Sequence, residues 1–280
     1  MKAVYEQEQQ KQQKQQKQQK LTVAKPRFIK KEYVYSFLLL LFLLISWDLL
    51  TRFGIVHELI LPGPLVVMGA MFELLAAPFF YSNLGVTLYE TLAGFAIGSI
   101  LSIILALVVV SIPILYKVLN PFIIIIQAVP KVALAPIFVT WFGFGLTAKV
   151  VMAVAICFFP TFINSVVGLK SVDEESKLLF QSMVASKKDL FFKLSLPTAL
   201  PYIFAGLKAS LTFALIGAIV GEFMGADKGI GMLINTFNFQ LEMDKVYALI
   251  IILSIIALLL YLFIEWVDKK IVFWTESNNQ

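Results

Sequence analysis

The sequence is poor in the residues on which most protein chemistry depends. Its 280 positions hold one histidine, His57, and one cysteine, Cys157, and charged residues make up only 15%. One cysteine excludes a disulfide within the chain, and this composition excludes a metal site built on a Cys/His cluster. We therefore expect no catalytic residue and no metal ligand, and we expect Cys157 to pack as a small apolar side chain.

A phosphate-binding loop is also missing. The pattern G-x-x-x-x-G-K-[ST] does not occur, so the chain cannot be a P-loop ATPase, and we expect no cofactor in this chain. A glycine-rich stretch, Gly225-Ala-Asp-Lys-Gly-Ile-Gly231, follows an apolar run. We interpret it as a flexible outer turn rather than a phosphate loop.

Long apolar runs dominate what is present, since 59% of the residues are hydrophobic. A helix of roughly 20 apolar residues crosses a bilayer, and helices satisfy their own backbone there. The sequence predicts an all-α integral membrane protein, with a short outer helix over Val66 to Ala76 and about six transmembrane helices, at residues 35–50, 84–110, 118–140, 149–169, 204–223 and 246–266.

Three regions follow along the chain. Residues 1–33 form a Gln/Lys-rich tail that has too few apolar residues to fold, residues 34–275 form the transmembrane domain, and 276–280 form a short C-terminal tail. The first apolar run lacks a small-residue cleavage site, so we expect it to be retained rather than removed as a signal peptide.

The distribution of Lys and Arg predicts the orientation. Residues 1–33 hold nine of the 23 and residues 169–203 hold five, whereas residues 53–83 hold none. Cytoplasmic flanks carry the excess of positive charge. We expect a multi-pass protein of the plasma or inner membrane with both termini in the cytoplasm.

The charged segment 172–197 stands apart from the spans. Val172-Asp-Glu-Glu175 places acidic residues at a helix N-terminus, where the helix dipole favours them. Five apolar side chains then supply a surface that needs a partner: Leu178, Leu179, Phe180, Met183 and Val184. A groove on another protein is one interpretation, and packing against the chain's own spans is the other.

Polar residues at membrane depth mark pathway candidates, because their burial in lipid is costly. We select Gln127, Lys131 and Glu222. Lys131 lies between Pro130 and Pro136 in the third span, where it can offer positive charge to an anion, or it can pair with Glu90. Lys208 and Glu265 are expected to snorkel to the cytoplasmic interface.

Prolines and glycines in the predicted spans indicate where helices bend and where they pack closely. Pro121, Pro130 and Pro136 in the third span and Pro160 in the fourth favour kinks. Gly94-x-x-x-Gly98 and Gly217-x-x-x-Gly221 permit close contact between helices.

Five stretches of the sequence are distinctive as motifs. They are Gln127-Ala-Val-Pro-Lys-Val-Ala-Leu-Ala-Pro136, Trp141-Phe-Gly-Phe-Gly145, Phe158-Phe-Pro-Thr-Phe-Ile-Asn164, Leu196-Pro-Thr-Ala-Leu-Pro-Tyr-Ile-Phe-Ala-Gly-Leu-Lys208 and Gly221-Glu-Phe-Met-Gly-Ala-Asp-Lys-Gly-Ile-Gly231. Together they resemble one known family, the permease subunits of bacterial ABC importers, in the branch that handles nitrate, aliphatic sulfonates, taurine and thiamine precursors. The resemblance covers about residues 61 to 275.

The resemblance implies a coupling helix, which sits in a groove of a separate ATPase. In the family, Glu-Ala-Ala is followed by Gly and then by hydrophobic-x-Leu-Pro. Aligned on Leu196-Pro197, this chain has Leu178-Leu-Phe180 in place of Glu-Ala-Ala and Val184 in place of Gly. The coupling residues implied are Val184, Ala185, Ser186, Lys187, Lys188, Leu194, Leu196 and Pro197.

The resemblance also implies the fold of a type I importer permease and its partners. These are ABC ATPase subunits that bind the ATP, an extracytoplasmic solute-binding protein, a second permease copy in a homodimer, and membrane lipid, without nucleic acid. The solute expected is small and anionic or heterocyclic. This subunit would be a transporter and not an enzyme.

Two other classes of function compete with this interpretation. An ion-coupled secondary transporter needs coupling residues deep in the bundle and inverted repeats, and we find no such repeats. An integral membrane enzyme needs a cluster of His, Cys or carboxylate groups, which the sequence does not offer.

Overall fold

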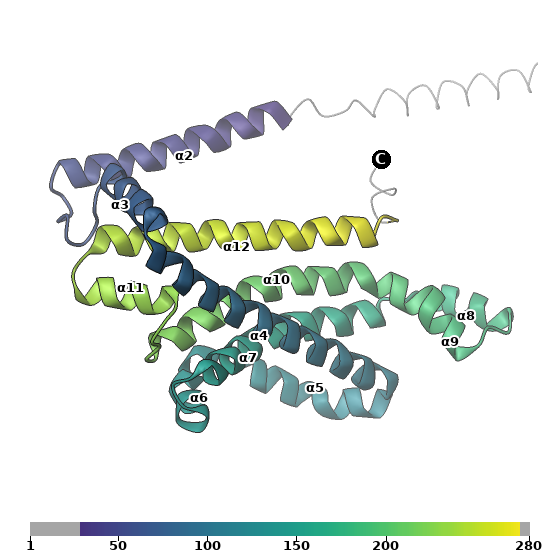
Figure 1. The fold of residues 1–280 in the computed structure, drawn as a ribbon. Helices are drawn as coiled ribbons and strands as arrows, with labels where there is room; N and C mark the ends of the chain where they lie inside the picture. The colour runs from purple at the N-terminus through teal and green to yellow at the C-terminus, as the bar shows by residue number, and fades with distance from the viewer. Residues whose placement is uncertain (1–28, 275–280) are drawn as a thin grey trace, which may run out of the picture. The chain divides into compact units, whose positions relative to one another are not determined.

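The computed structural model of the protein describes residues 29–274, which contain helices, turns and bends but no strand (Figure 1). The predicted all-α membrane fold is confirmed. The C-terminal tail 276–280 and most of the N-terminal tail lie outside the described residues. Helix α2, Ile29–Arg52, already begins inside the region predicted as tail.

The chain divides into two compact units, residues 1–58 and 59–280. The first unit contains α2, which is long and apolar enough to cross a membrane. Near its end, Arg52 lies 2.7 Å from the Asp48 carboxylate one turn earlier. An ion pair at this spacing suits the polar boundary of a span.

The second unit contains the remaining candidate spans. These are α4 (Pro78–Ser111), α7 (Leu146–Lys170), the helical stretch Lys187–Phe223 that ends in α10 (Leu196–Phe223), and α12 (Met243–Ile271). A bent pair of shorter helices completes a sixth span if it is counted as one. This agrees with the prediction of about six.

Helix α7 lies at the centre of the second unit, against α4 and α10. A Cβ added at Gly94 of α4 would collide with the Cβ of Ala153, and one added at Gly217 of α10 would lie 2.6 Å from the Cα of the same Ala153. Gly98 and Gly221 face Cys157 and Lys149 of α7 in the same way. Both predicted glycine pairs therefore bring a helix close to α7.

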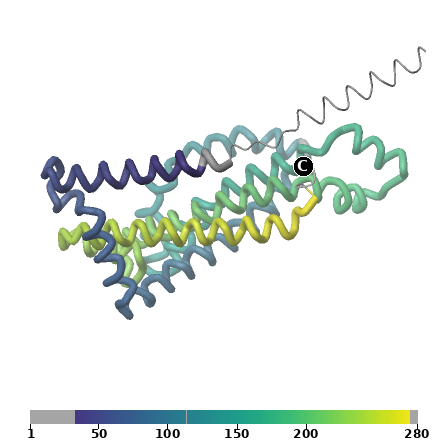
Figure 2. Tube along the Cα trace, turned by 90° about the horizontal axis from the view of Figure 1, so that it is seen from above, coloured from purple at the N-terminus to yellow at the C-terminus, as the bar shows by residue number. Residues whose placement is uncertain are grey.

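The shorter helices lie at opposite ends of this unit. Helices α3 (Pro64–Ala76) and α11 (Ile230–Phe239) pack against α12 near its start. Helices α8 (Glu174–Ser182) and α9 (Lys187–Leu190) project at the other end, as both views show (Figures 1 and 2). A π-helical turn, η2 (Phe191–Ser195), joins α9 to α10.

Candidate functional site

The predicted third span is broken in two. Helix α5 (Pro113–Ala128) ends before Pro130, a 3₁₀ turn, η1 (Lys131–Leu134), follows, and α6 (Ala135–Phe142) leaves at 82° to α5. Pro130 disfavours helical geometry in the residue before it. Val129 accordingly adopts an extended conformation, φ −63° and ψ 128°.

A break of this kind leaves backbone groups without helical partners at membrane depth. Such backbone is tolerated where it is buried in protein or lines a water-filled cavity, and broken helices of this kind form binding sites in many transporters. The sequence predicted kinks at the prolines, but not that one proline would turn the chain by this angle.

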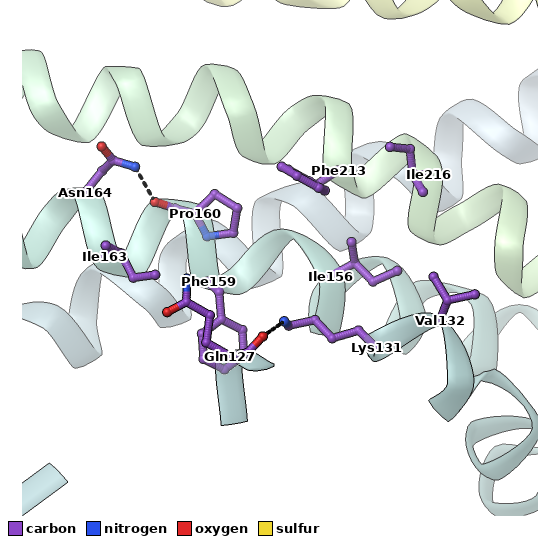
Figure 3. A pocket seen from close by; sticks show the side chains of 10 residues that line it. All are labelled: Gln127, Lys131, Val132, Ile156, Phe159, Pro160, Ile163, Asn164, Phe213 and Ile216. Carbon is purple, nitrogen blue, oxygen red and sulfur yellow. Dashed lines mark hydrogen bonds between the residues drawn. The ribbon is translucent and has the colours of Figure 1, made fainter. Parts of the chain in front are cut away.

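A cavity of about 570 Å³ lies beside the break. Its walls come from the α5 to η1 turn, from α7 and from α10, and most of its lining side chains are apolar (Figure 3). The lining residues are Gln127, Lys131, Val132, Ile156, Phe159, Pro160, Ile163, Asn164, Phe213 and Ile216. A largely apolar cavity with a few polar groups is typical of a small-molecule site.

Lys131 supplies the positive charge of this cavity. Its ammonium donates a hydrogen bond to the backbone carbonyl of Gln127 at 3.1 Å and lies 4.7 Å from the ring centroid of Phe159 (Figure 3). No Asp or Glu is among the lining residues. The cavity therefore combines one cation with aromatic and aliphatic walls, which suits an anionic or ring-bearing solute better than a cation.

Asn164 and Phe159 are cavity residues that the sequence did not single out. The Asn164 side-chain amide donates to the carbonyl of Pro160, one turn earlier in α7, at 2.8 Å. Phe159 also lines a second, almost wholly apolar cavity of about 420 Å³ together with Lys131. An amide in an apolar span, four residues after a proline, was the available signal for Asn164.

The structure brings two of the three predicted pathway residues together. Gln127 and Lys131 line the cavity, whereas Glu222 does not. Glu222 is buried at the end of α10, where Thr87 and the backbone of Gly231 donate hydrogen bonds to its carboxylate. The proposed pairing of Lys131 with Glu90 is wrong, because Glu90 faces Lys149 of α7, with 3.5 Å between Nζ and Oε1.

The glycine-rich segment 225–231 is held in place rather than loose. The backbone N–H of Gly229 donates to Asn83 Oδ1 at 2.8 Å, and that of Ile230 donates to Thr87 Oγ1 at 2.8 Å. Gly229 has φ 130°, and a Cβ there would collide with the Glu222 carboxylate. The segment thus uses its glycines for close approach to Glu222, and the prediction of a merely flexible turn was incomplete.

The charged segment predicted to dock a partner forms α8, a turn and α9. Asp173 caps α8 by accepting the Ser176 N–H at 2.9 Å, and Ser186 caps α9 by accepting the Asp189 N–H at 3.1 Å. The hydrogen bond from the Ser176 N–H lowers the pKa of Asp173 below its ordinary value. Both caps satisfy backbone donors that a short isolated helix would otherwise leave unpaired.

Apolar side chains of this segment point into solvent. Leu178, Leu179 and Met183 are each at least 60% exposed, and Val184 is 90% exposed. Packing against the chain's own spans, the second interpretation of this surface, is therefore wrong for these four side chains, whereas Phe180 is half-buried. Val184 has φ 56°, a left-handed conformation that is unusual for a β-branched residue.

Within residues 29–274, no group of three or more His, Cys, Asp or Glu side chains converges. Cys157 is fully buried between α7 and α4, and its thiol points at the Gly94 carbonyl 3.5 Å away. It packs as an apolar side chain would.

Comparison with known proteins identifies a matching family and several relatives of this chain. Residues 98–273 match a family described as the binding-protein-dependent transport system inner membrane component. The formylaminopyrimidine transport permease protein ThiX of Halalkalibacterium halodurans is 33% identical over 241 residues, 86% of this chain and 96% of that protein. A putative aliphatic sulfonates transport permease protein, SsuC of Bacillus subtilis, is 29% identical over 233 residues, 82% of this chain and 84% of its own length.

A solved structure shares the fold. A crystal structure of an amino acid ABC transporter with histidines superposes with a TM-score of 0.54, covering 70% of this chain and 93% of that chain at 21% sequence identity. At this identity the likeness concerns the fold alone.

Proposed function

Because the chain belongs to the family of binding-protein-dependent transport system inner membrane components, we propose that it is the pore-forming permease subunit of an ATP-driven importer. The protein is a multi-pass transport subunit of the inner membrane and not an enzyme, and ATP hydrolysis belongs to a separate ATPase. The observation that carries the proposal is the helix broken at Pro130 beside a cavity of about 570 Å³.

The solute passes along this cavity. Lys131 and Gln127 lie at the break, and the α7 and α10 side chains form the opposite walls. Two copies of the chain enclose the pathway in a homodimer, a solute-binding protein delivers the solute on the outer side, and lipid covers the remaining apolar faces. The chain itself binds no cofactor, since the partner ATPase binds the ATP.

The solute is a small anionic or heterocyclic molecule. Relatives are named for formylaminopyrimidine, aliphatic sulfonates, taurine and nitrate. One ammonium, two side-chain amides and an aromatic wall fit a sulfonate, nitrate, taurine or a thiamine-precursor pyrimidine.

The cavity is tested with Lys131→Gln in proteoliposomes that hold the permease and its ATPase. For an anionic solute we expect uptake to fall by about 10- to 100-fold, the value of one charge-assisted hydrogen bond. Lys117→Gln is the matched control, because Lys117 is an exposed lysine of α5 that does not line the cavity. Equal uptake by Lys131→Gln and the wild type would remove Lys131 from the pathway.

The segment from α8 to the start of α10 couples the movement of the pore to ATP binding and hydrolysis by the partner ATPase. We assign the contact to Val184, Ala185, Ser186, Lys187 and Lys188, with Leu194, Leu196 and Pro197 joining it to α10 through the π-helical turn. Its exposed apolar side chains fit a groove on a partner protein. Closure of the ATPases then moves the coupling helices and shifts the pore between outward and inward states.

Coupling is tested by cysteine cross-linking. Ser186→Cys in a Cys157→Ala background, co-expressed with the cognate ATPase, should give a cross-link that changes with ATP. The same protein should not be labelled at position 186 from outside intact cells, because both termini and this segment lie in the cytoplasm. Outside labelling without a cross-link would invert the topology and exclude the importer.

An ion-coupled secondary transporter is the remaining alternative. Purified permease alone in proteoliposomes separates the two classes, because an importer subunit needs added ATPase and ATP. Uptake driven by a proton or sodium gradient without the ATPase would favour the carrier.

A further inference from the structure

Three ionisable side chains are buried together where α4, α7, α10 and α11 meet. Glu90 of α4 is 0% exposed, Glu222 of α10 is 1% exposed, and Lys149 of α7 is 7% exposed. None of them lines the large cavity. Burial of charge in protein is costly unless the charges balance and find hydrogen bonds, so the way these three groups balance is informative.

Glu222 is bonded as an ionised carboxylate. Thr87 donates its hydroxyl hydrogen to Oε1 at 2.6 Å, and Gly231 donates its backbone N–H to Oε2. The Thr87 oxygen accepts the Ile230 N–H, and its one hydrogen has two acceptors within reach: the Glu222 carboxylate at 2.6 Å and, farther away at 3.3 Å, the Asn83 carbonyl. The carboxylate also lies at the N-terminus of α11, where the helix dipole favours negative charge.

Glu90 is placed differently. Neither of its oxygens receives a hydrogen bond from any donor in the described part of the chain. The charged side chains that act on it are Lys149 of α7, with Nζ 3.5 Å from Oε1, and Glu222 of α10. Lys149 acts on Glu222 as well, so one ammonium serves two carboxyl groups.

If both carboxyl groups are ionised, the cluster holds one more negative charge than positive charge. Two carboxylates and one ammonium leave a net charge of −1 in a site closed to water. Thr87, one turn before Glu90 on α4, donates to Glu222, but the two Glu90 oxygens have no donor in the described part of the chain. A second carboxylate cannot supply one, because carboxylates only accept. One added proton removes both difficulties, since it neutralises the cluster and supplies the missing donor.

We propose that this cluster is a proton-binding site in which Glu90, although it lies 3.5 Å from Lys149, is a neutral carboxylic acid that donates a hydrogen bond to Glu222, while the Glu222 carboxylate balances the charge of Lys149. The bound ligand is one proton. Its role is to let α4 sit against the ends of α7 and α10 without an unbalanced charge. The site is separate from the transport pathway and does not rest on the proposed function.

The contrast between two amide substitutions tests the assignment. Glu90→Gln replaces a neutral acid by a neutral group that can also donate to Glu222, so we expect the melting temperature to stay within about 2 °C of the wild type. Glu222→Gln removes the negative charge that balances Lys149. It also places either an NH₂ group or a neutral amide oxygen, which is a weaker acceptor than a carboxylate, opposite the Gly231 N–H. We expect its melting temperature to fall by at least about 4 °C.

Infrared spectroscopy provides a readout that does not depend on the Glu222 variant folding. The wild type at neutral pH should show the carbonyl stretch of a protonated carboxylic acid, and Glu90→Gln should lose it. Glu58→Gln, at an exposed glutamate, is the control and should leave the band unchanged. Two results would each overturn the proposal: no such band lost in Glu90→Gln, or a Glu90→Gln protein destabilised as much as Glu222→Gln.

Discussion

The ammonium of Lys208 on α10 lies 2.9 Å from the carboxylate of Asp268 on α12, and both side chains are about one-fifth exposed. This ion pair joins two helices that are 60 residues apart in sequence. Exposed ion pairs contribute little to the free energy of unfolding, whereas breaking a buried pair is costly. A partly buried pair should contribute an intermediate amount. We therefore expect Lys208→Met to lower the free energy of unfolding by about 1–2 kcal/mol.

A double-mutant cycle isolates this interaction. Lys208→Met and Asp268→Leu, alone and combined, should give a coupling energy of about 1 kcal/mol in mixed-micelle unfolding. The Lys269 and Glu265 pair on α12 is the control, because it is more exposed and should couple by about 0.3–0.5 kcal/mol. Equal coupling in the two pairs would mean that burial adds nothing at Lys208.

The close approach of α10 to α7 makes a second prediction. Gly217→Ala would place a Cβ 2.6 Å from the Cα of Ala153, so the helices must move apart. We expect a loss of about 1–3 kcal/mol in unfolding free energy, the usual cost of overpacking. Gly69→Ala in α3 is the matched control, because nothing lies within 4 Å of its added Cβ.

The control should change stability in the opposite sense. Alanine in an open helical position stabilises by about 0.5–1 kcal/mol relative to glycine. If Gly217→Ala and Gly69→Ala shift the unfolding midpoint in the same direction, the contact of α10 with α7 is not the tight one described.

Val184 holds a backbone conformation that suits glycine. Its φ is 56° and its side chain is 90% exposed, so the backbone is strained and no burial of apolar surface offsets that strain. Val184→Gly should relieve about 1 kcal/mol in the turn between α8 and α9. The measurement is hydrogen exchange at the Ala185 amide, which donates to the Phe180 carbonyl at 3.1 Å; we expect it to slow about fivefold.

A neighbouring substitution controls for flexibility. Met183 has an ordinary φ of −80°, so Met183→Gly should loosen the turn and speed exchange at Ala185. Faster exchange in Val184→Gly as well would show that the left-handed geometry carries no strain.

The spans were predictable because their signal is local. Runs of apolar residues set the helices, and α7 at Leu146–Lys170 encloses the predicted 149–169. Proline chemistry likewise predicted irregularity near Pro130. The angle of 82° did not follow, because it depends on how α6 packs on α7 and not on the proline alone.

The pairing of ionisable residues was not predictable. Lys208 was expected to snorkel, but its ion pair with Asp268 was not predicted, and Glu90 lies beside Lys149 rather than beside Lys131. Each pair joins different helices, so the partner is fixed by how the helices pack and leaves no pattern in local sequence. Gln127 and Lys131 were found because a polar or charged side chain within an apolar span is visible in the local sequence.

The cap of α8 predicts a pH dependence at the coupling segment. Hydrogen bonds from Ser176 hold the pKa of Asp173 below its ordinary value of 3.8 when α8 is folded. A carboxyl group with a depressed folded pKa stabilises fully above its unfolded pKa and loses that contribution as pH falls through the folded value. We therefore expect α8 to be fully folded at neutral pH and to fray only below about pH 4.

Hydrogen exchange at the Ser176 amide, followed from pH 6 down to pH 3 and corrected for intrinsic rates, measures this fraying. Asp173→Asn keeps a side-chain acceptor but cannot titrate, so its protection should not change over that range; a parallel loss in both proteins would place the pH-sensitive group elsewhere.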